Sequence, residues 1–288
     1  MMTDRRTFMK QTGIAVAALA FAPSCVLGGS DKPLGIQLYS LKDQLPLDPK
    51  GVLVKVAKTG YKQVEVYGYE NAKFFGLSVQ EFKKALDING LVSPSGHYGM
   101  DDFLSGKQNN LDELISVSNQ LKHEYLVIPH IGEELRKTAD DYKKLAERFN
   151  LAGKLCKQGG LKLGYHNHDF EFTNFDGETG YDIFLKNTDP SLVDFEMDLY
   201  WVVRAGSDPI ALFKQNPHRF RMWHIKDMDK TNHVLNTEIG KGTVDFKKIF
   251  DNRELSGVKY YYLEQENYKI DPYKSIKESY NYIETQLL

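Results

Sequence analysis

The sequence is poor in cysteine and nearly free of net charge, and each shortage excludes a class of protein. Two cysteines among 288 residues, Cys25 and Cys156, are too few for a disulfide scaffold or a cysteine-rich zinc module. The 37 basic and 39 acidic residues leave a formal net charge of -2, which lacks the concentrated positive charge that draws proteins to nucleic acid. With 41% hydrophobic and 26% charged residues, the chain is typical of a globular protein stabilised by an ordinary core.

The apolar stretch near the N-terminus is short, and it follows a pair of arginines. It runs from Gly13 to Ala22, whereas a membrane span needs about 20 apolar residues. Arg5 and Arg6 precede it, and this order is typical of a twin-arginine export signal. An amphipathic first helix is the alternative, but residues 14–21 have no polar face. We therefore predict an export signal over residues 1–24 and an exported protein.

The end of this segment resembles a loose bacterial lipoprotein box. Residues 22–25 read Ala-Pro-Ser-Cys, so lipidation of Cys25 would anchor the protein at the cell envelope and would be its one link to a membrane. Without lipidation the product would be free in the periplasm. Residues 25–32 are predicted to be a short tether, and residues 33–288 the folded domain. Cys156 lies in a helical pattern and is predicted to be buried packing rather than a reactive thiol.

From Pro33 onward, short apolar runs alternate with longer helical patterns. The predicted strands are residues 34–38, 63–67, 91–93, 125–128, 161–165, 193–197, 220–223 and 258–263. Helical patterns lie between them, for example over residues 79–88, 111–121 and 142–156. This alternation predicts parallel strands that are joined by helical crossovers.

A chemically useful side chain lies at or just past the end of every predicted strand. These residues are Tyr39, Glu65, His97, His130, His166, Asp198, His224 and Glu264. The first and the last are 225 residues apart over seven intervals, about 32 residues each, which is the size of one unit of a (β/α)8 barrel. An open doubly wound sheet is the alternative, but it usually has a glycine-rich turn after its first strand, and residues 39–43 contain no glycine. We predict a single (β/α)8 TIM barrel of the α/β class, with its active site at the carboxyl ends of the strands.

Five of the eight histidines follow predicted strands and would meet at one end of such a barrel. They are His97, His130, His166, His168 and His224. Asp198 and Glu264 would join them there, and imidazoles and carboxylates packed this closely need a compensating cation or substrate. We predict a divalent metal ion, with a purely hydrogen-bonded cluster as the alternative.

Six segments, in this order along the chain, resemble one family. They are residues 35–40 (Gly-Ile-Gln-Leu-Tyr-Ser), 165–170 (Tyr-His-Asn-His-Asp-Phe), 198–201 (Asp-Leu-Tyr-Trp), 224–227 (His-Ile-Lys-Asp), 240–246 (Gly-Lys-Gly-Thr-Val-Asp-Phe) and 263–266 (Leu-Glu-Gln-Glu). They make the chain similar to the xylose-isomerase-like TIM-barrel superfamily of sugar and sugar-phosphate isomerases and epimerases. The likeness covers nearly everything after Pro33.

The resemblance implies one divalent ion that is held by residues from the fifth to the eighth strand. Carried over position by position, its ligands are His166, Asp198, His224 and Glu264. His166 departs from the family, in which most relatives have a glutamate at this position. The set therefore carries two negative charges rather than three, and the extra imidazole moves the preference from Mg²⁺ toward Zn²⁺, Mn²⁺ or Co²⁺.

The resemblance also implies removal of a proton next to a carbonyl, with metal stabilisation of the resulting enediolate. The family's epimerases exchange this proton between two ligand glutamates, of which only Glu264 remains here. His168 lies two residues after His166 on the same face of its strand, so it is the predicted general acid or base. Lys226 is predicted to protonate an oxygen or to stabilise the enediolate. Glu264, His168 and Lys226 form the predicted catalytic set.

A second set of residues is predicted to bind the substrate. Its members are Tyr39, Glu65, His97, His130 and Trp201. The glutamate would hold a sugar hydroxyl, the histidines would line the pocket, and the aromatic side chains would stack against sugar rings.

Phosphate recognition is not evident from the sequence. The turn at residues 240–242 offers backbone amides to an anion, but a helix start that is capped by Asp245 explains it equally well. An exported enzyme also has little contact with sugar phosphates. A neutral sugar or keto-sugar is therefore the predicted small-molecule partner.

These features together predict a divalent-metal-dependent sugar isomerase or epimerase that acts through an enediolate. The missing glutamate leaves a one-base reaction open, namely a lyase, dehydratase or hydratase that acts on a keto-sugar or keto-glycoside. A non-catalytic sugar-binding barrel is a further alternative, although metal-ligand residue types are present at all four strands. A nuclease on this fold is disfavoured by the charge of -2, so no nucleic acid partner is predicted. The oligomeric state stays open.

Overall fold

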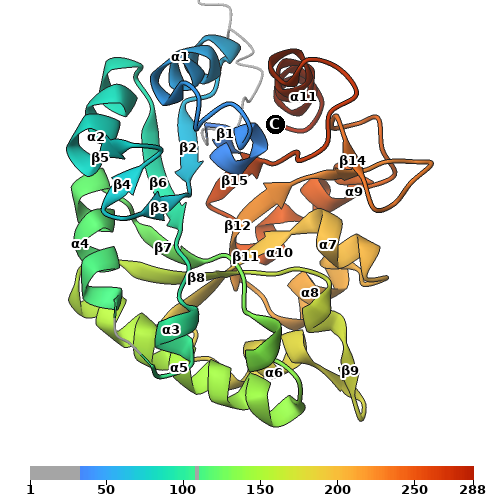
Figure 1. Ribbon diagram of the computed structural model, residues 1–288. Helices are drawn as coiled ribbons and strands as arrows, with labels where there is room; N and C mark the ends of the chain where they lie inside the picture. The colour runs from blue at the N-terminus through green and yellow to red at the C-terminus, as the bar shows by residue number, and fades with distance from the viewer. Residues whose placement is uncertain (1–32, 108–109) are drawn as a thin grey trace, which may run out of the picture.

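Eight parallel strands close into a barrel, which confirms the predicted fold (Figure 1). The barrel strands are β1 (Gly35–Gln37), β2 (Gln63–Val66), β6 (Val92–His97), β7 (Tyr125–Ile128), β8 (Lys162–His166), β11 (Val193–Asp198), β12 (Phe220–Ile225) and β15 (Tyr260–Leu263). Neighbours around the barrel are consecutive barrel strands along the chain, and β1 completes the ring by pairing with β15.

The computed structural model describes residues 33–107 and 110–288. The predicted export signal at residues 1–24, the lipidation site at Cys25 and the tether at residues 25–32 lie outside the described residues and stay predictions. Among the described residues, no helix has both the length and the apolar character that a membrane crossing requires.

Helices surround the barrel as an outer ring (Figure 1). They are α1 (Pro49–Thr59), α2 (Val79–Ile88), α3 (Asp101–Leu104), α4 (Leu111–Leu121), α5 (Ala139–Gln158), α6 (Gly180–Asn187), α7 (Leu199–Arg204), α8 (Pro209–Gln215), α9 (Phe246–Asp251), α10 (Arg253–Ser256) and α11 (Pro272–Gln286). The predicted patterns over residues 79–88 and 111–121 match α2 and α4. Helix α5 begins before the pattern at residues 142–156, because Thr138 and Asp141 form a capping box that starts it at Ala139.

Short elements follow five of the barrel strands and build the loops at their carboxyl ends. They are the 3-10 helices η1 (Leu38–Leu41), η2 (Glu133–Leu135) and η3 (Phe170–Phe172), the three-stranded sheet of β3 (Tyr69–Glu70), β4 (Lys73–Phe74) and β5 (Leu77–Ser78), and the hairpins of β9 (Asn174–Phe175) with β10 (Glu178–Thr179) and of β13 (Asp227–Met228) with β14 (Asn236–Thr237).

The barrel interior changes from apolar to charged along the strands. Four buried side chains form an apolar cluster of their own: Tyr125, Val127, Met222 and Tyr262. Alternate residues of a strand point to the same face, so His224 and Glu264 repeat the direction of Met222 and Tyr262 one step further along. The ends of β12 and β15 therefore carry charge into the barrel above an apolar floor.

The layer between the barrel and the helices is a large aromatic and aliphatic core. Trp223 points outward from β12 into this layer and stacks on Phe213 of α8, with ring centroids 5.1 Å apart. The thiol of Cys156 on α5 is buried in the same layer, and burial raises its pKa to about 12. This agrees with the prediction that Cys156 is packing rather than a nucleophile.

His123 is a buried imidazole that makes stability depend on pH. Its ring nitrogens lie 3.1 Å from the Ser93 hydroxyl and 3.4 Å from the Tyr98 hydroxyl, and burial lowers its pKa from 6.5 to about 3. The unfolded chain therefore takes up a proton at this residue as the pH falls below 6.5, while the folded chain stays unprotonated until about pH 3. His123 alone should lower the free energy of unfolding by about 2 to 3 kcal/mol between pH 7 and about pH 4.5.

Urea unfolding at the two pH values measures this loss, with His123→Gln as the comparison because an amide keeps hydrogen-bonding capacity but does not titrate. The variant should lose less stability than the wild type over the same interval. Equal losses in the two proteins would show that His123 does not titrate on unfolding.

Candidate active site

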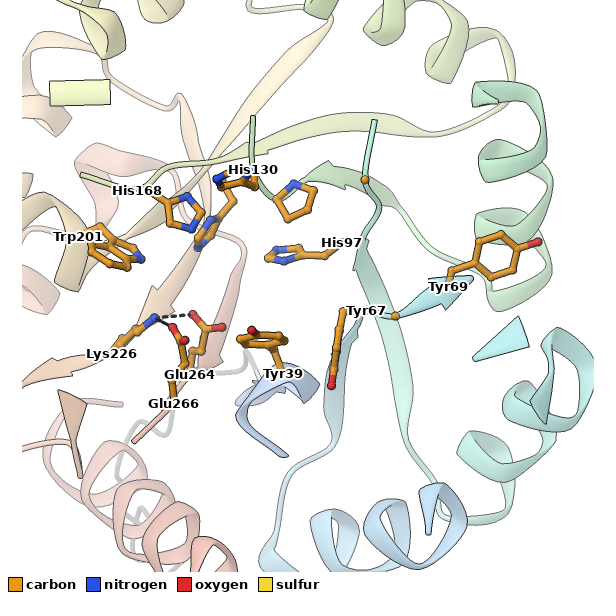
Figure 2. A pocket seen from close by; sticks show the side chains of 14 residues that line it. Tyr39, Tyr67, Tyr69, His97, His130, His168, Trp201, Lys226, Glu264 and Glu266 are labelled. Atoms are coloured by element: carbon orange, nitrogen blue, oxygen red, sulfur yellow. Dashed lines mark hydrogen bonds and ion pairs between the residues drawn. The ribbon is translucent and has the colours of Figure 1, made fainter. Parts of the chain in front are cut away.

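A cavity of about 480 Å³ opens at the carboxyl ends of the barrel strands. Eight of the residues singled out from the sequence line it: Tyr39, His97, His130, His166, His168, Trp201, Lys226 and Glu264. Figure 2 shows Trp201 and His168 on one side of the cavity and Tyr39 and Tyr67 on the other, with Lys226 below Trp201 and Glu264 between Lys226 and Tyr39 in this view. The structure therefore brings these residues from distant parts of the chain to one place.

Four side chains beside the cavity form a group that suits a metal ion. They are His166, Asp198, His224 and Glu264. Each offers one ligand atom, and these atoms all lie within 4.8 Å of one another. They come from the ends of β8, β11 and β12 and from the residue after β15, which is the set that the family resemblance implied.

Buried atoms in this group lack hydrogen-bond partners within the described chain. Both ring nitrogens of His166 and the Oδ2 atom of Asp198 are buried and make no hydrogen bond within the described chain, although His166 Nε2 and Asp198 Oδ2 are only 3.5 Å apart. Leaving such groups unsatisfied costs about 1 to 3 kcal/mol each. A divalent ion would satisfy one ring nitrogen of His166 and the Asp198 oxygen, and two imidazoles with two carboxylates are the donors that Zn²⁺, Mn²⁺ or Co²⁺ accept. The residues present thus fit a metal ion.

The protonation states of the group agree with this assignment. Burial, followed by the neighbouring His224 and His97, lowers the pKa of His166 to about 3, so its ring is neutral and free to act as a ligand. Burial would raise the pKa of Glu264, but Lys226 and His224 hold it well below the ordinary value. Burial raises the pKa of Asp198 even though Lys226 opposes the change.

Lys226 is a buried ammonium that is surrounded by carboxylates. Its Nζ lies 3.2 Å from Glu264 Oε2 and 3.7 Å from Asp198 Oδ2, and it also contacts Glu266 (Figure 2). Burial alone would lower the pKa of Lys226, but these carboxylates raise it above its ordinary value. Lys226 therefore keeps its positive charge inside the cavity, where it is available to a substrate oxygen.

His168 is held rigidly and remains neutral. Its ring stacks on Phe170 at a centroid distance of 5.3 Å and lies 5.4 Å from Trp201, and its backbone N–H donates to Glu171 Oε2 at 2.9 Å. Burial, and next the nearby His166, lowers the pKa of His168 well below its ordinary value. Its Nδ1 atom is buried and has no hydrogen-bond partner within the described chain, while the residue itself lines the cavity.

Trp201 is fixed by one of the candidate metal ligands. The Oδ1 atom of Asp198 accepts a hydrogen bond from the Trp201 backbone N–H at 3.1 Å, which caps α7 and sets the position of the indole beside Lys226. On the opposite wall, Tyr39 packs edge-on against Tyr67 at 5.0 Å. The cavity thus has aromatic side chains on two sides, as sugar recognition by stacking requires.

Glu65 does not line the cavity, although it was predicted to hold a sugar hydroxyl. It is fully buried and accepts hydrogen bonds from Gln37 Nε2 at 2.8 Å and from the Ser95 hydroxyl at 2.6 Å. Its Oε2 atom also lies 2.7 Å from His224 Nε2. Protein groups therefore occupy both of its carboxylate oxygens.

Sequence reasoning missed Glu196 and Glu266. Glu196 is fully buried on β11, and its Oε2 atom lies 2.7 Å from His97 Nε2 and 3.2 Å from His224 Nε2. It stands two residues before Asp198, and Glu266 stands two residues after Glu264. The two-residue period of inward-facing side chains is the signal that would have found both.

The turn at residues 240–242 encloses the carboxylate of Asp227. The backbone N–H groups of Met228, Gly240, Gly242 and Val244 all donate to the Asp227 carboxylate at 2.9 to 3.1 Å. Asp245 caps α9, as the sequence indicated. The amides of this turn are therefore engaged by Asp227.

Comparisons with known proteins agree with this architecture. A family model described as a xylose isomerase-like TIM barrel matches residues 53–286. An inosose dehydratase of Clostridium perfringens is 29% identical over an alignment 271 residues long, and the match covers 79% of this chain and 88% of the relative. A solved structure of a sugar phosphate isomerase/epimerase from Parabacteroides distasonis has a TM-score of 0.77 at 29% identity and covers 92% of this chain and 97% of that one. The IOLI protein, solved with a zinc atom, shares the fold with a TM-score of 0.68 at 13% identity over 86% of this chain and 95% of that one.

Proposed function

The chain belongs to the xylose isomerase-like TIM barrel family, and from this membership we propose a divalent-metal-dependent lyase that acts on a keto-sugar or a related cyclic ketone. It would remove a proton next to the carbonyl and then expel the oxygen substituent on the β-carbon. The inosose dehydratase named among its relatives is, by that name, an enzyme that removes water from a cyclic ketone.

The observation that carries the proposal is the unequal chemistry of the two sides of the cavity. A pair of glutamates facing one another would suit exchange of a proton between the two faces of a sugar. Here a histidine, His166, replaces one of them, and the free imidazole of His168 faces an ammonium group on Lys226 instead. One base and one cation suit a reaction that removes a single proton and releases a leaving group.

The chain's own residues divide this chemistry between them. His168 accepts the proton through its neutral ring, which lines the cavity, and its stacking on Phe170 keeps the ring in place. Lys226 donates a hydrogen bond to the oxygen on which negative charge develops, because Glu264 and Glu266 keep it protonated and aimed into the cavity. Trp201 and Tyr39 hold the ring of the substrate between them.

The proposed ligands of the metal ion are His166, Asp198, His224 and Glu264. The chemistry that a bound divalent ion supplies at this place is polarisation of the substrate's carbonyl, which acidifies the neighbouring C–H bond. Its identity is proposed to be Zn²⁺, Mn²⁺ or Co²⁺ rather than Mg²⁺, because two of the four donors are imidazoles.

Isomerisation or epimerisation is the second candidate. The observation in its favour is the Parabacteroides distasonis structure, which bears the name sugar phosphate isomerase/epimerase and is 29% identical to this chain.

A neutral substrate remains our proposal. The positive charge of Lys226 is already balanced by neighbouring carboxylates, and the backbone amides of Gly240, Gly242 and Val244 donate to Asp227. Neither group is therefore available to bind a phosphate.

Reaction in deuterated water distinguishes the two candidates. The metal-loaded full chain is incubated with keto-sugars that carry a hydroxyl or alkoxyl group β to the carbonyl, and products are followed by NMR and mass spectrometry. We expect release of water or alcohol, and we expect removal of the metal by a chelator to stop it. Deuterium incorporation with an unchanged carbon skeleton and no leaving group would instead establish the isomerase. Sugar binding that survives chelation without any turnover would contradict both candidates.

A further inference from the structure

We propose that Glu65 and Glu196 are positioning residues that fix which nitrogen of His224 faces the metal ion. His224 lies between two carboxylate environments. Its Nδ1 atom is 3.0 Å from Glu264 Oε2, on the side of the candidate metal group. Its Nε2 atom is 2.7 Å from Glu65 Oε2 and 3.2 Å from Glu196 Oε2, on the opposite side. The inference rests on the metal centre of the proposed function.

The protonation of an imidazole ring decides which of its nitrogens can bind a metal ion. A neutral ring carries one N–H group, and only the other nitrogen can bind a metal ion. Glu65 and Glu196 accept hydrogen bonds and have none to donate when ionised. When an ion occupies Nδ1, the hydrogen of His224 must stand on Nε2, where Glu65 and Glu196 lie within hydrogen-bond distance to accept it.

The carboxylate of Glu65 accepts hydrogen bonds from two neighbouring side chains. Gln37 Nε2 donates to its Oε2 atom at 2.8 Å, and the Ser95 hydroxyl donates to its Oε1 atom at 2.6 Å. These neighbours come from the flanking strands, since Glu65 pairs with Gln37 of β1 on one side and with Ser95 of β6 on the other. The carboxylate is thus locked by the barrel itself and presents a fixed oxygen to His224.

His97 ties the two carboxylates together. Its Nε2 atom lies 2.7 Å from Glu196 Oε2 and 3.1 Å from Glu65 Oε2, and its ring stacks nearly parallel to that of His224 at a centroid distance of 5.3 Å. The result is a four-membered arrangement in which two imidazole nitrogens alternate with two carboxylate oxygens. Burying two carboxylates this deeply is expensive, and orienting a metal ligand is a use that accounts for their presence.

A second metal ion among the same four residues is the competing interpretation, because their ligand atoms also lie within 4.8 Å of one another. That ion would require an unprotonated Nε2 on His224 while the first ion requires an unprotonated Nδ1. A neutral imidazole cannot supply both. The hydrogen-bonded arrangement needs no such deprotonation, so we assign one ion per chain and a positioning role to the inner carboxylates.

The test is the affinity of the full chain for Zn²⁺ and Co²⁺, measured by competition with a chromophoric chelator, in wild type, Glu65→Gln, Glu196→Gln and the double variant. Loss of such partners typically weakens metal binding by about 10- to 100-fold, and we expect the double variant to show the largest loss. Glu171→Gln is the matched control, because Glu171 is equally buried near the cavity but belongs to neither metal group. Its affinity should change less than threefold, and thermal unfolding of the metal-free proteins shows whether all of them fold.

A second measurement uses the wild type alone, so that it does not depend on whether the variants fold. Nitrogen-15 spectra of histidine-labelled protein with the ion bound should show His224 protonated on Nε2 alone. Protonation of Nδ1 in the ion-bound protein, two ions per chain, or unchanged affinity in a folded double variant would overturn the inference. Wild-type protein that binds no metal at all would overturn the proposed function instead, so the two failures are distinguishable.

Discussion

Replacing Glu264 with glutamine is expected to empty the metal site and to lower kcat/KM by at least about a thousandfold, or about 4 kcal/mol of transition-state stabilisation. Glu264 Oε2 lies 3.0 Å from His224 Nδ1 and 3.2 Å from Lys226 Nζ. An amide at this position removes a negative ligand and leaves the Lys226 ammonium with one carboxylate fewer. Kinetics on the identified substrate and the metal content of the purified protein measure the two effects together.

Glu266→Gln is the matched control for this prediction. Glu266 also contacts Lys226 and lines the cavity, but it is not part of the candidate metal group. We expect its variant to keep a full complement of metal and to lose less than about tenfold in kcat/KM, as for loss of one partially exposed ion pair. If both variants kept their metal and lost the same activity, Glu264 would not be a ligand.

Replacing Asp227 with alanine is expected to lower the free energy of unfolding by about 4 kcal/mol, because it leaves two buried backbone N–H groups without an acceptor at about 1 to 3 kcal/mol each. These are the N–H groups of Met228 and Val244, and the less buried N–H groups of Gly240 and Gly242 donate to the same carboxylate. The segment from β13 to the start of α9 would lose the group around which it folds. Urea unfolding at neutral pH is the measurement.

Asp245→Ala calibrates the size of this effect. Asp245 also accepts a backbone hydrogen bond, from Lys248 at 3.1 Å, but it does so at the exposed start of α9. Loss of a helix cap of this kind costs about 1 kcal/mol. Similar losses in the two variants would mean that the loop is held by contacts other than the Asp227 carboxylate.

The barrel was predictable from the sequence because its signals are local and repeated. Each strand is a short apolar run, and the next one follows at an average interval of about 32 residues, so the count of eight and the order of strands were found without any tertiary information. The small sheets and hairpins after β2, β8 and β12 were not predicted. Two-residue strands carry no periodicity, and their form depends on the side chains packed beneath them.

The metal group was predicted through the family resemblance, but the inner carboxylates were not predicted. The strands of a barrel are tilted and staggered, so equal distances from a strand end do not mean equal depth. His166 pairs with Glu196 across β8 and β11, whereas Asp198 pairs with His224. The same stagger places Glu65 level with Gln37 and Ser95, below the cavity, which its position near the end of β2 did not reveal.

The closure of the barrel between β1 and β15 also has a consequence for synthesis of the protein. β1 is synthesised first, but it cannot pair with its second neighbour, β15, until residues 260–263 have left the ribosome. The candidate metal ligands are spread in the same way, with His166 made long before Glu264. A nascent chain that ends before β15 has neither a closed ring nor a complete candidate metal group. Folding to the native state is therefore completed only after translation has passed the last strand.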